Sequence, residues 1–134
     1  MSPAPISLTD RFAALDLLPN RTPDLEDRVT EDAGPRWLDT LGTYRDGGIF
    51  IVHYSGDSAW ERHVADEVVM VIDGETTMTL VIDGAATEVL MTSMQMVVVP
   101  ADTWHRFHTP DRVQVMTITP QPTEHRLDDP TTSG

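Results

Sequence analysis

The sequence feature that most constrains the fold is a series of short runs rich in β-branched and apolar residues, which begins near residue 37 and continues to residue 118. No helical pattern interrupts the series. The runs cover about eight segments: 48–55, 59–63, 67–72, 75–82, 86–91, 95–99, 104–109 and 112–118. Short strands at a spacing of roughly 8–12 residues predict an all-β sandwich or a small barrel.

Residues that favour turns separate most of these runs. They are Gly47-Gly48, Gly56-Asp57, Asp73-Gly74, Asp83-Gly84 and Pro100-Ala101-Asp102. Asp-Gly between two strand-like runs predicts a hairpin, because both central residues can adopt a positive φ. We therefore expect hairpin turns at both Asp-Gly pairs.

The two ends of the chain have a different character. Residues 7–18 predict a short helix with Ser7 as its N-cap and with Pro19 ending it. Residues 19–36 are rich in proline and acidic residues and predict an irregular arm. The chain of 134 residues fits one core, so we expect a helix and arm over residues 1–45, a barrel over 46–120 and a flexible tail over 121–134.

Composition excludes several kinds of chemistry. The chain has no cysteine, which excludes disulfides, thiolate nucleophiles and cysteine-ligated metal sites. All nine basic residues are arginine, so lysine-bound PLP and Schiff-base chemistry are excluded as well. The formal net charge of −13 argues against a nucleic-acid partner, because a field of that sign repels phosphates.

The sequence also predicts a location. The N-terminus has neither the basic segment nor the apolar segment of a signal peptide. No run approaches the roughly 20 apolar residues that a membrane helix needs. We therefore expect a cytoplasmic protein with no membrane partner.

Charged side chains gather in the segment AWERHVADE, residues 59–67. Residues two apart on a strand share a face, so Glu61 and His63 point the same way, and Glu67 opens the next strand and can return to that side. His105 begins a strand about forty residues later and can face them across a barrel. Two imidazoles and two carboxylates form a mixed N/O set that suits a divalent transition metal: Fe, Mn, Ni or Zn.

The residue pattern alone leaves alternatives open. A buried charged set needs compensation, which a metal ion would supply, as would pairing with Arg62, Arg106 or Arg112. His53 lies on the preceding strand and can reach the interior or pack elsewhere. His108 lies three residues after His105, so strand alternation points it away from the site.

Two segments resemble the motifs of the cupin superfamily, G-x5-H-x-H-x3–4-E-x6-G and G-x5-P-x-G-x2-H-x3-N. GDSAWERHVADEVVMVIDG resembles the first motif, and MQMVVVPADTWHRFHT resembles the second. The matching positions are Gly56, His63, Glu67 and Gly74 in the first, and Pro100 and His105 in the second. The resemblance covers about residues 48–118 and implies a double-stranded β-helix, or jelly-roll barrel, with a metal in its mouth.

The resemblance also implies a ligand set by position: Glu61, His63, Glu67 and His105. Glu61 stands where the first motif has a histidine, and the spacing from Gly56 is one residue short. In the second motif Met94 and Asp102 replace glycines, and Thr109 replaces the asparagine. Aspartate tolerates the left-handed conformation, so that turn can survive, whereas we expect the loop near Met94 to differ in shape.

Three functions remain open at this point. The resemblance favours a metal-dependent dioxygenase, isomerase or epimerase that acts on a small polar organic substrate in the barrel mouth, with Glu67 as a catalytic base. A non-enzymatic small-molecule-binding or sensor protein is the second reading. A barrel that has lost its metal is the third.

The irregular arm and the exposed edge strands of an open barrel predict a homodimer. Light scattering at micromolar concentration should therefore give twice the monomer mass of 14.9 kDa. A monomeric mass would contradict this prediction.

Overall fold

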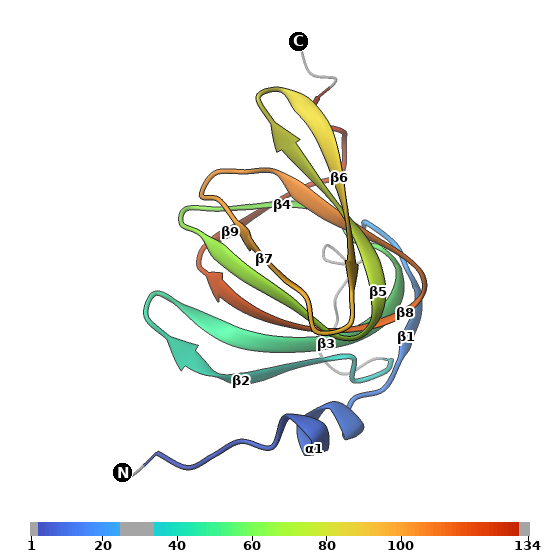
Figure 1. The fold of residues 1–134 in the computed structure, drawn as a ribbon, viewed down its shortest axis with the longest axis vertical. Coiled ribbons are helices and arrows are strands. Elements are labelled where there is room, and N and C mark those ends of the chain that lie inside the picture. Colours follow the sequence, from blue (N-terminus) through green and yellow to red (C-terminus); the bar gives the residue numbers. More distant parts are fainter. Residues whose placement is uncertain (1–2, 25–33, 132–134) are drawn as a thin grey trace.

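The computed structural model describes residues 3–24 and 34–131. These residues form one short helix and nine strands, as Figure 1 shows. The helix is α1 (Leu8–Ala13), and the strands are β1 (Leu18–Arg21), β2 (Leu38–Tyr44), β3 (Gly47–Asp57), β4 (Trp60–His63), β5 (Glu67–Ile82), β6 (Ala85–Thr92), β7 (Met96–Val99), β8 (His105–Pro120) and β9 (Thr123–Arg126). The predicted all-β class is confirmed.

Strand β8 organises the sheet. It pairs antiparallel with β3, β4 and β5, while β5 also pairs with β6 and β7, β3 with β1 and β2, and β4 with β9. The strands curve around a common interior, so the sheet is rolled rather than flat (Figure 1). The two longest strands, β5 and β8, each have 16 residues and run the length of this roll.

The core fills the interior of the roll. Alternate residues of a strand face the same side, and β5 and β8 accordingly bury every second side chain over much of their length. The main apolar cluster consists of Tyr54, Val69, Val71, Met78, Leu80, Met91, Val99, Phe107, Val113 and Val115. Burial of these side chains is the main stabilising contribution to the rolled sheet.

The N-terminal helix is shorter than predicted. Ser7 is the N-cap, as expected, and its Oγ accepts a hydrogen bond from the backbone N–H of Asp10. The helix ends at Ala13, and Leu18–Arg21 instead pairs in parallel with β3. Pro19 therefore lies inside a short edge strand, a position that proline tolerates, rather than ending the helix.

The helix lies against the outside of the sheet beside β2 and β3 (Figure 1). Phe12 and Leu15 are buried against Ile51 of β3. The prediction of an irregular arm over residues 19–36 is wrong where β1 begins, and residues 25–33 lie outside the described residues.

One of the two predicted Asp-Gly hairpins is instead a bulge. Asp83 and Gly84 form the predicted turn between β5 and β6, both with positive φ. Gly74 also has a positive φ, of 86°, but β5 continues through it, and its register against β8 shifts there. A bulge and a hairpin use the same left-handed backbone, so the dipeptide alone does not distinguish them.

The C-terminal tail is also more ordered than predicted. Residues 123–126 form β9, which pairs antiparallel with β4, so the prediction of a flexible tail over 121–134 is wrong for this part. The pairing sets His125 opposite Glu61 and Thr123 opposite His63. The last strand therefore borders the residues that the motifs single out.

The bulge predicts a position-specific sensitivity. A Cβ on Gly74 would lie 2.2 Å from the backbone oxygen of Arg112, whereas a Cβ on Gly84 would meet nothing within 4 Å. Both glycines have positive φ, so Gly84→Ala reports the backbone strain alone, about 1 kcal/mol. Gly74→Ala should lower the free energy of unfolding by roughly 2–4 kcal/mol in chemical denaturation, because strand β8 must also shift. Equal losses in the two variants would show that the close approach to β8 has no energetic effect.

Candidate metal centre

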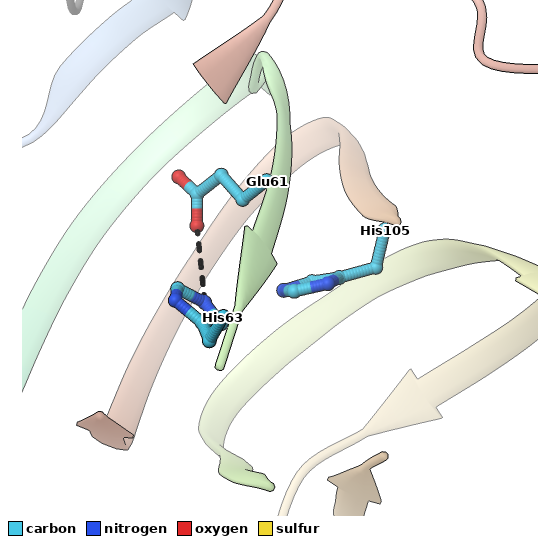
Figure 2. Close-up of side chains that lie close together, drawn as sticks. All are labelled: Glu61, His63 and His105. Carbon is cyan, nitrogen blue, oxygen red and sulfur yellow. Dashed lines mark ion pairs between the residues drawn. The ribbon is translucent and has the colours of Figure 1, made fainter. Parts of the chain in front are cut away.

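Strand β4 supplies two of the four predicted site residues. Glu61 and His63 lie two apart on this strand and point to the same side, as Figure 2 shows. Glu61 pairs across the sheet with His105 at the start of β8. The register of two short strand segments thus brings Glu61, His63 and His105 together (Figure 2).

The three side chains form a compact cluster. One ligand atom from each of Glu61, His63 and His105 lies within 4.8 Å of the others. His63 is 4% exposed and His105 is 0% exposed, while the Glu61 side chain is 20% exposed. The cluster is therefore buried on the histidine side and opens on the glutamate side.

Glu67 joins the cluster from the first position of β5. Its Oε1 lies 3.0 Å from His105 Nε2, and its Oε2 lies 3.4 Å from His63 Nε2. The Thr119 hydroxyl donates a hydrogen bond of 2.6 Å to Glu67 Oε2. Glu67 thus lies between the two imidazoles, beside the compact cluster that Glu61, His63 and His105 form.

The outer nitrogen of each imidazole is held by a hydrogen bond. His105 Nδ1 donates to the carbonyl oxygen of Thr103 at 2.9 Å. His63 Nδ1 lies 3.0 Å from the Thr123 hydroxyl, which also lies 3.3 Å from Gln121 Oε1. Both rings are thereby oriented with Nε2 toward the carboxylates, as metal-ligating histidines are.

His63 Nε2 shows that this set suits a cation. It is buried and has no hydrogen-bond partner among the described residues. It faces carboxylate oxygens of Glu67 and Glu61 at 3.4 and 3.9 Å. A buried imidazole nitrogen that faces carboxylate oxygens without a hydrogen bond belongs to an N/O donor set that fits a metal ion.

The charges of the cluster depend on one another. Burial disfavours the ionised form of Glu67, but the hydrogen bond from His105 and the nearby His63 outweigh it and lower the pKa of Glu67 to about 2. Burial likewise disfavours the imidazolium form of His105, and the hydrogen bond to Glu67 outweighs it and raises the pKa of His105. Each of the two groups therefore stabilises the charged form of the other.

Glu61 has a second neighbour on its other side. His125 of β9 lies with Nε2 3.7 Å from Glu61 Oε1. Burial raises the pKa of Glu61, and the interaction with His125 and the charge of Arg21 overcome this effect and lower it. Glu61 is consequently a carboxylate, and both His63 and His125 lie within 4 Å of its oxygens.

The arginines considered as alternative partners for the carboxylates lie elsewhere. Arg62 pairs with Glu124, Arg112 pairs with Asp73, and Arg106 stacks on the ring of Trp60. Among the described residues, none of these three arginines forms an ion pair with Glu61 or Glu67. Compensation of the cluster by those arginines is therefore not observed.

The remaining histidines of the barrel lie outside the cluster. His108 faces outward, with a side chain that is 60% exposed, and pairs with Asp57. His53 contacts Arg112 at 3.3 Å. The outward direction predicted for His108 is confirmed.

A cavity of about 320 Å³ adjoins the cluster. It is lined by Arg21, Trp37, Leu38, Phe50, Val52, Tyr54, Glu61, Glu67, Phe107, Val115, Thr117, Thr119, Gln121, Thr123 and His125. Sequence reasoning did not find Arg21, Thr119, Thr123 and His125. These residues come from strands that are distant in the chain. Thr123 and His125 reach the site only through the pairing of β9 with β4.

The departures from the cupin motifs have a simple backbone explanation. Met94 and Asp102, which replace motif glycines, both adopt positive φ, of 68° and 57°. Backbone hydrogen bonds between Met94 N and Val71 O and between Val71 N and Gln95 O hold the loop in place. The methionine thus adopts the conformation that favours glycine, and backbone pairing with β5 compensates the strain.

Comparison with known proteins assigns the family. The family model Cupin_2, a cupin domain, matches residues 48–126, which is more than half of the chain. The chain therefore belongs to the cupin family, as the two motifs indicated. No curated protein matches the chain significantly.

Solved structures share the same fold. The conserved protein SPY1581 of unknown function from Streptococcus pyogenes matches with a TM-score of 0.59 and 15% identity over 91% of this chain and 90% of that chain. Hydroquinone 1,2-dioxygenase from Sphingomonas sp. TTNP3, with 4-hydroxybenzoate bound, matches with a TM-score of 0.55 and 17% identity over 72% and 70%. Hydroquinone 1,2-dioxygenase PnpCD, in complex with Cd²⁺ and 4-hydroxybenzonitrile, matches with a TM-score of 0.56 and 17% identity over 69% and 68%. At these identities the likeness shows the fold alone.

The described residues contain no helix with the length and apolar character that crossing a membrane requires.

The ion pair predicts how stability depends on pH in chelator-treated protein. The pKa of Glu67 falls from 4.5 to about 2 on folding, so its contribution is present above pH 4.5 and is lost as the pH falls toward 2. The pKa of His105 rises from 6.5, so its contribution is present below pH 6.5 and is lost as the pH rises through the folded value. The stability difference between the wild type and Glu67→Gln should therefore be greatest between pH 4.5 and 6.5, on the order of 3 kcal/mol.

Thermal or urea unfolding across this pH range measures the difference. Glu88→Gln serves as the matched control, because Glu88 is exposed on β6 and should shift stability by less than about 0.5 kcal/mol. If the difference in unfolding free energy between the wild type and Glu67→Gln does not vary with pH, the ion pair between Glu67 and His105 does not form.

Proposed function

We propose that this cupin binds a divalent transition metal through Glu61, His63, Glu67 and His105, and acts as a metal-dependent enzyme on a small organic molecule. The observation that carries the proposal is the buried His63 Nε2, which faces two carboxylates and has no hydrogen-bond partner among the described residues. The N/O donor set suits Fe, Mn, Ni or Zn.

The reaction class follows from the position of the cluster beside a cavity. When bound, such a metal supplies a Lewis acid, and Fe or Mn also supplies redox chemistry. We propose a dioxygenase-type oxidation or a metal-assisted proton transfer. The hydroquinone dioxygenases that share the fold support the first of these at the level of the fold.

The structure favours a particular role for Glu67. A catalytic base works best when its pKa lies near the working pH, whereas the pKa of Glu67 is about 2. Thr119 and His105 each hold one of its oxygens and stabilise the carboxylate form. We therefore propose that Glu67 is a metal ligand rather than the catalytic base that the cupin resemblance implies.

The protein's own residues prepare the site in two ways. The contacts of Thr103 and Thr123 with the Nδ1 atoms orient both imidazoles with Nε2 toward the cluster. The fold also excludes bulk water from the histidine side of the cluster, where His63 and His105 are 4% and 0% exposed. Electrostatic interactions in such an enclosed site are stronger than in water.

Metal content tests the proposal directly. Protein purified without chelator should carry about one metal ion per chain by elemental analysis. His63→Ala and His105→Ala should lower metal affinity at least about tenfold, and Glu61→Ala should also weaken it, because each removes a donor from the cluster. His108→Ala is the matched control, since His108 lies on the outer face and should leave the metal content unchanged.

Identical trace metal in the wild type and in all three cluster variants would contradict the metal site. Oxygen consumption by the loaded protein with catechols, β-diketones and thiols then separates an oxidase-type enzyme from a non-enzymatic binding protein, which would retain the metal and consume no oxygen.

A further inference from the structure

The cavity beside the metal centre has two chemically different walls. Strand β3 contributes Phe50, Val52 and Tyr54 to one wall. Strands β4 and β9 contribute Glu61, Thr123 and His125 to the other. Strand β8 lies between β3 and β4 in the sheet order, so the apolar and the polar walls face the cavity from opposite sides of β8.

The side chains of strand β8 that line the cavity also change from apolar to polar along the strand. Val115 pairs with Val52, and Thr117 pairs with Phe50, so the strand becomes polar as it runs toward Thr119. Thr119 then contacts Glu67 of the cluster. The change from apolar to polar side chains therefore leads toward the proposed metal ligands.

The apolar wall is rigid. Trp37 and Tyr54 meet edge to face, with ring centroids 6.1 Å apart, and the Arg21 guanidinium carbon lies 4.8 Å from each ring centroid. Tyr54 is 2% exposed, which leaves its ring little freedom to turn. A wall that is already in place favours a ligand body of matching shape, because little ordering is needed on binding.

The wall chemistry also restricts the ligand. A ligand without an apolar body would place hydrated polar groups against Phe50 and Val52, whose side chains offer no hydrogen bond, and this is unfavourable. Oxygen groups at the other end would meet threonine hydroxyls, His125 and the proposed metal. A volume of about 320 Å³ is at the low end of the range for small-molecule sites, so the ligand is small.

From these features we infer that the substrate is a small molecule with an apolar ring or branched body, which packs against β3, and with its oxygen groups confined to the end that faces β4 and β9. A monocyclic phenol represents this class, whereas a polyol or a short dicarboxylate does not. The inference depends on the proposed function in one respect, which is that the oxygen groups of the substrate would meet the proposed metal. It makes the expectation of a small polar organic substrate more specific.

Calorimetry on the metal-loaded protein tests the inference. We expect 4-methylphenol to bind at least about tenfold more tightly than malonate or a pentitol, because only the phenol satisfies both walls. Phe50→Asn should weaken phenol binding at least about tenfold, and Phe50→Leu, which keeps an apolar side chain, should change it less than about threefold. Metal content should be unchanged in both variants.

A second variant guards against a folding defect in Phe50→Asn. Leu38 lines the cavity but is 44% exposed, so Leu38→Asn should fold normally and still weaken phenol binding. Tighter binding of malonate or the pentitol by protein with normal metal content would overturn the inference and leave the proposed function intact. Protein that carries no metal would contradict the proposed function. If such protein still binds phenol and the binding depends on Phe50 and Leu38, the inference is upheld. If it does not bind phenol, the inference is overturned.

Discussion

The pairing of β8 with three neighbouring strands is the constraint on which the rest of the structure depends. Through its register with β4, β8 sets His105 opposite Glu61. Through its register with β3 and β5, the same strand supplies the core residue Val115 and the hydroxyl of Thr119 that holds Glu67. A change of register by one residue would turn all of these side chains to the opposite face, so the fold and the site are specified by one set of backbone hydrogen bonds.

The cluster places two carboxylates and two imidazoles in a largely buried space. Such an arrangement is unfavourable unless its charges are compensated, and here the compensation comes from within the cluster, through His105 and Glu67. His63 Nε2 has no hydrogen-bond partner among the described residues, while its Nδ1 lies 3.0 Å from the Thr123 hydroxyl. The same hydrogen bonds that orient the rings therefore leave one donor atom suited to a cation.

Much of this arrangement is predictable from the sequence, and the remainder depends on long-range pairing. Strand periodicity places Glu61 and His63 on one face, and the spacing of the two motifs selects Glu67 and His105. The bulge at Gly74 was mistaken for a hairpin because both structures require the same positive φ, which only the register with β8 distinguishes. Strand β9 was missed because a segment rich in proline and acidic residues has the composition of a loop, and its partner β4 lies some sixty residues earlier.

The pairing of β9 with β4 has a consequence for access to the site. Thr123 and His125 of β9 lie beside His63 and Glu61, yet neither apolar cluster of the described residues includes a residue of β9. A change that releases β9 from β4 would therefore uncover this side of the site and leave the packing of the rolled sheet in place.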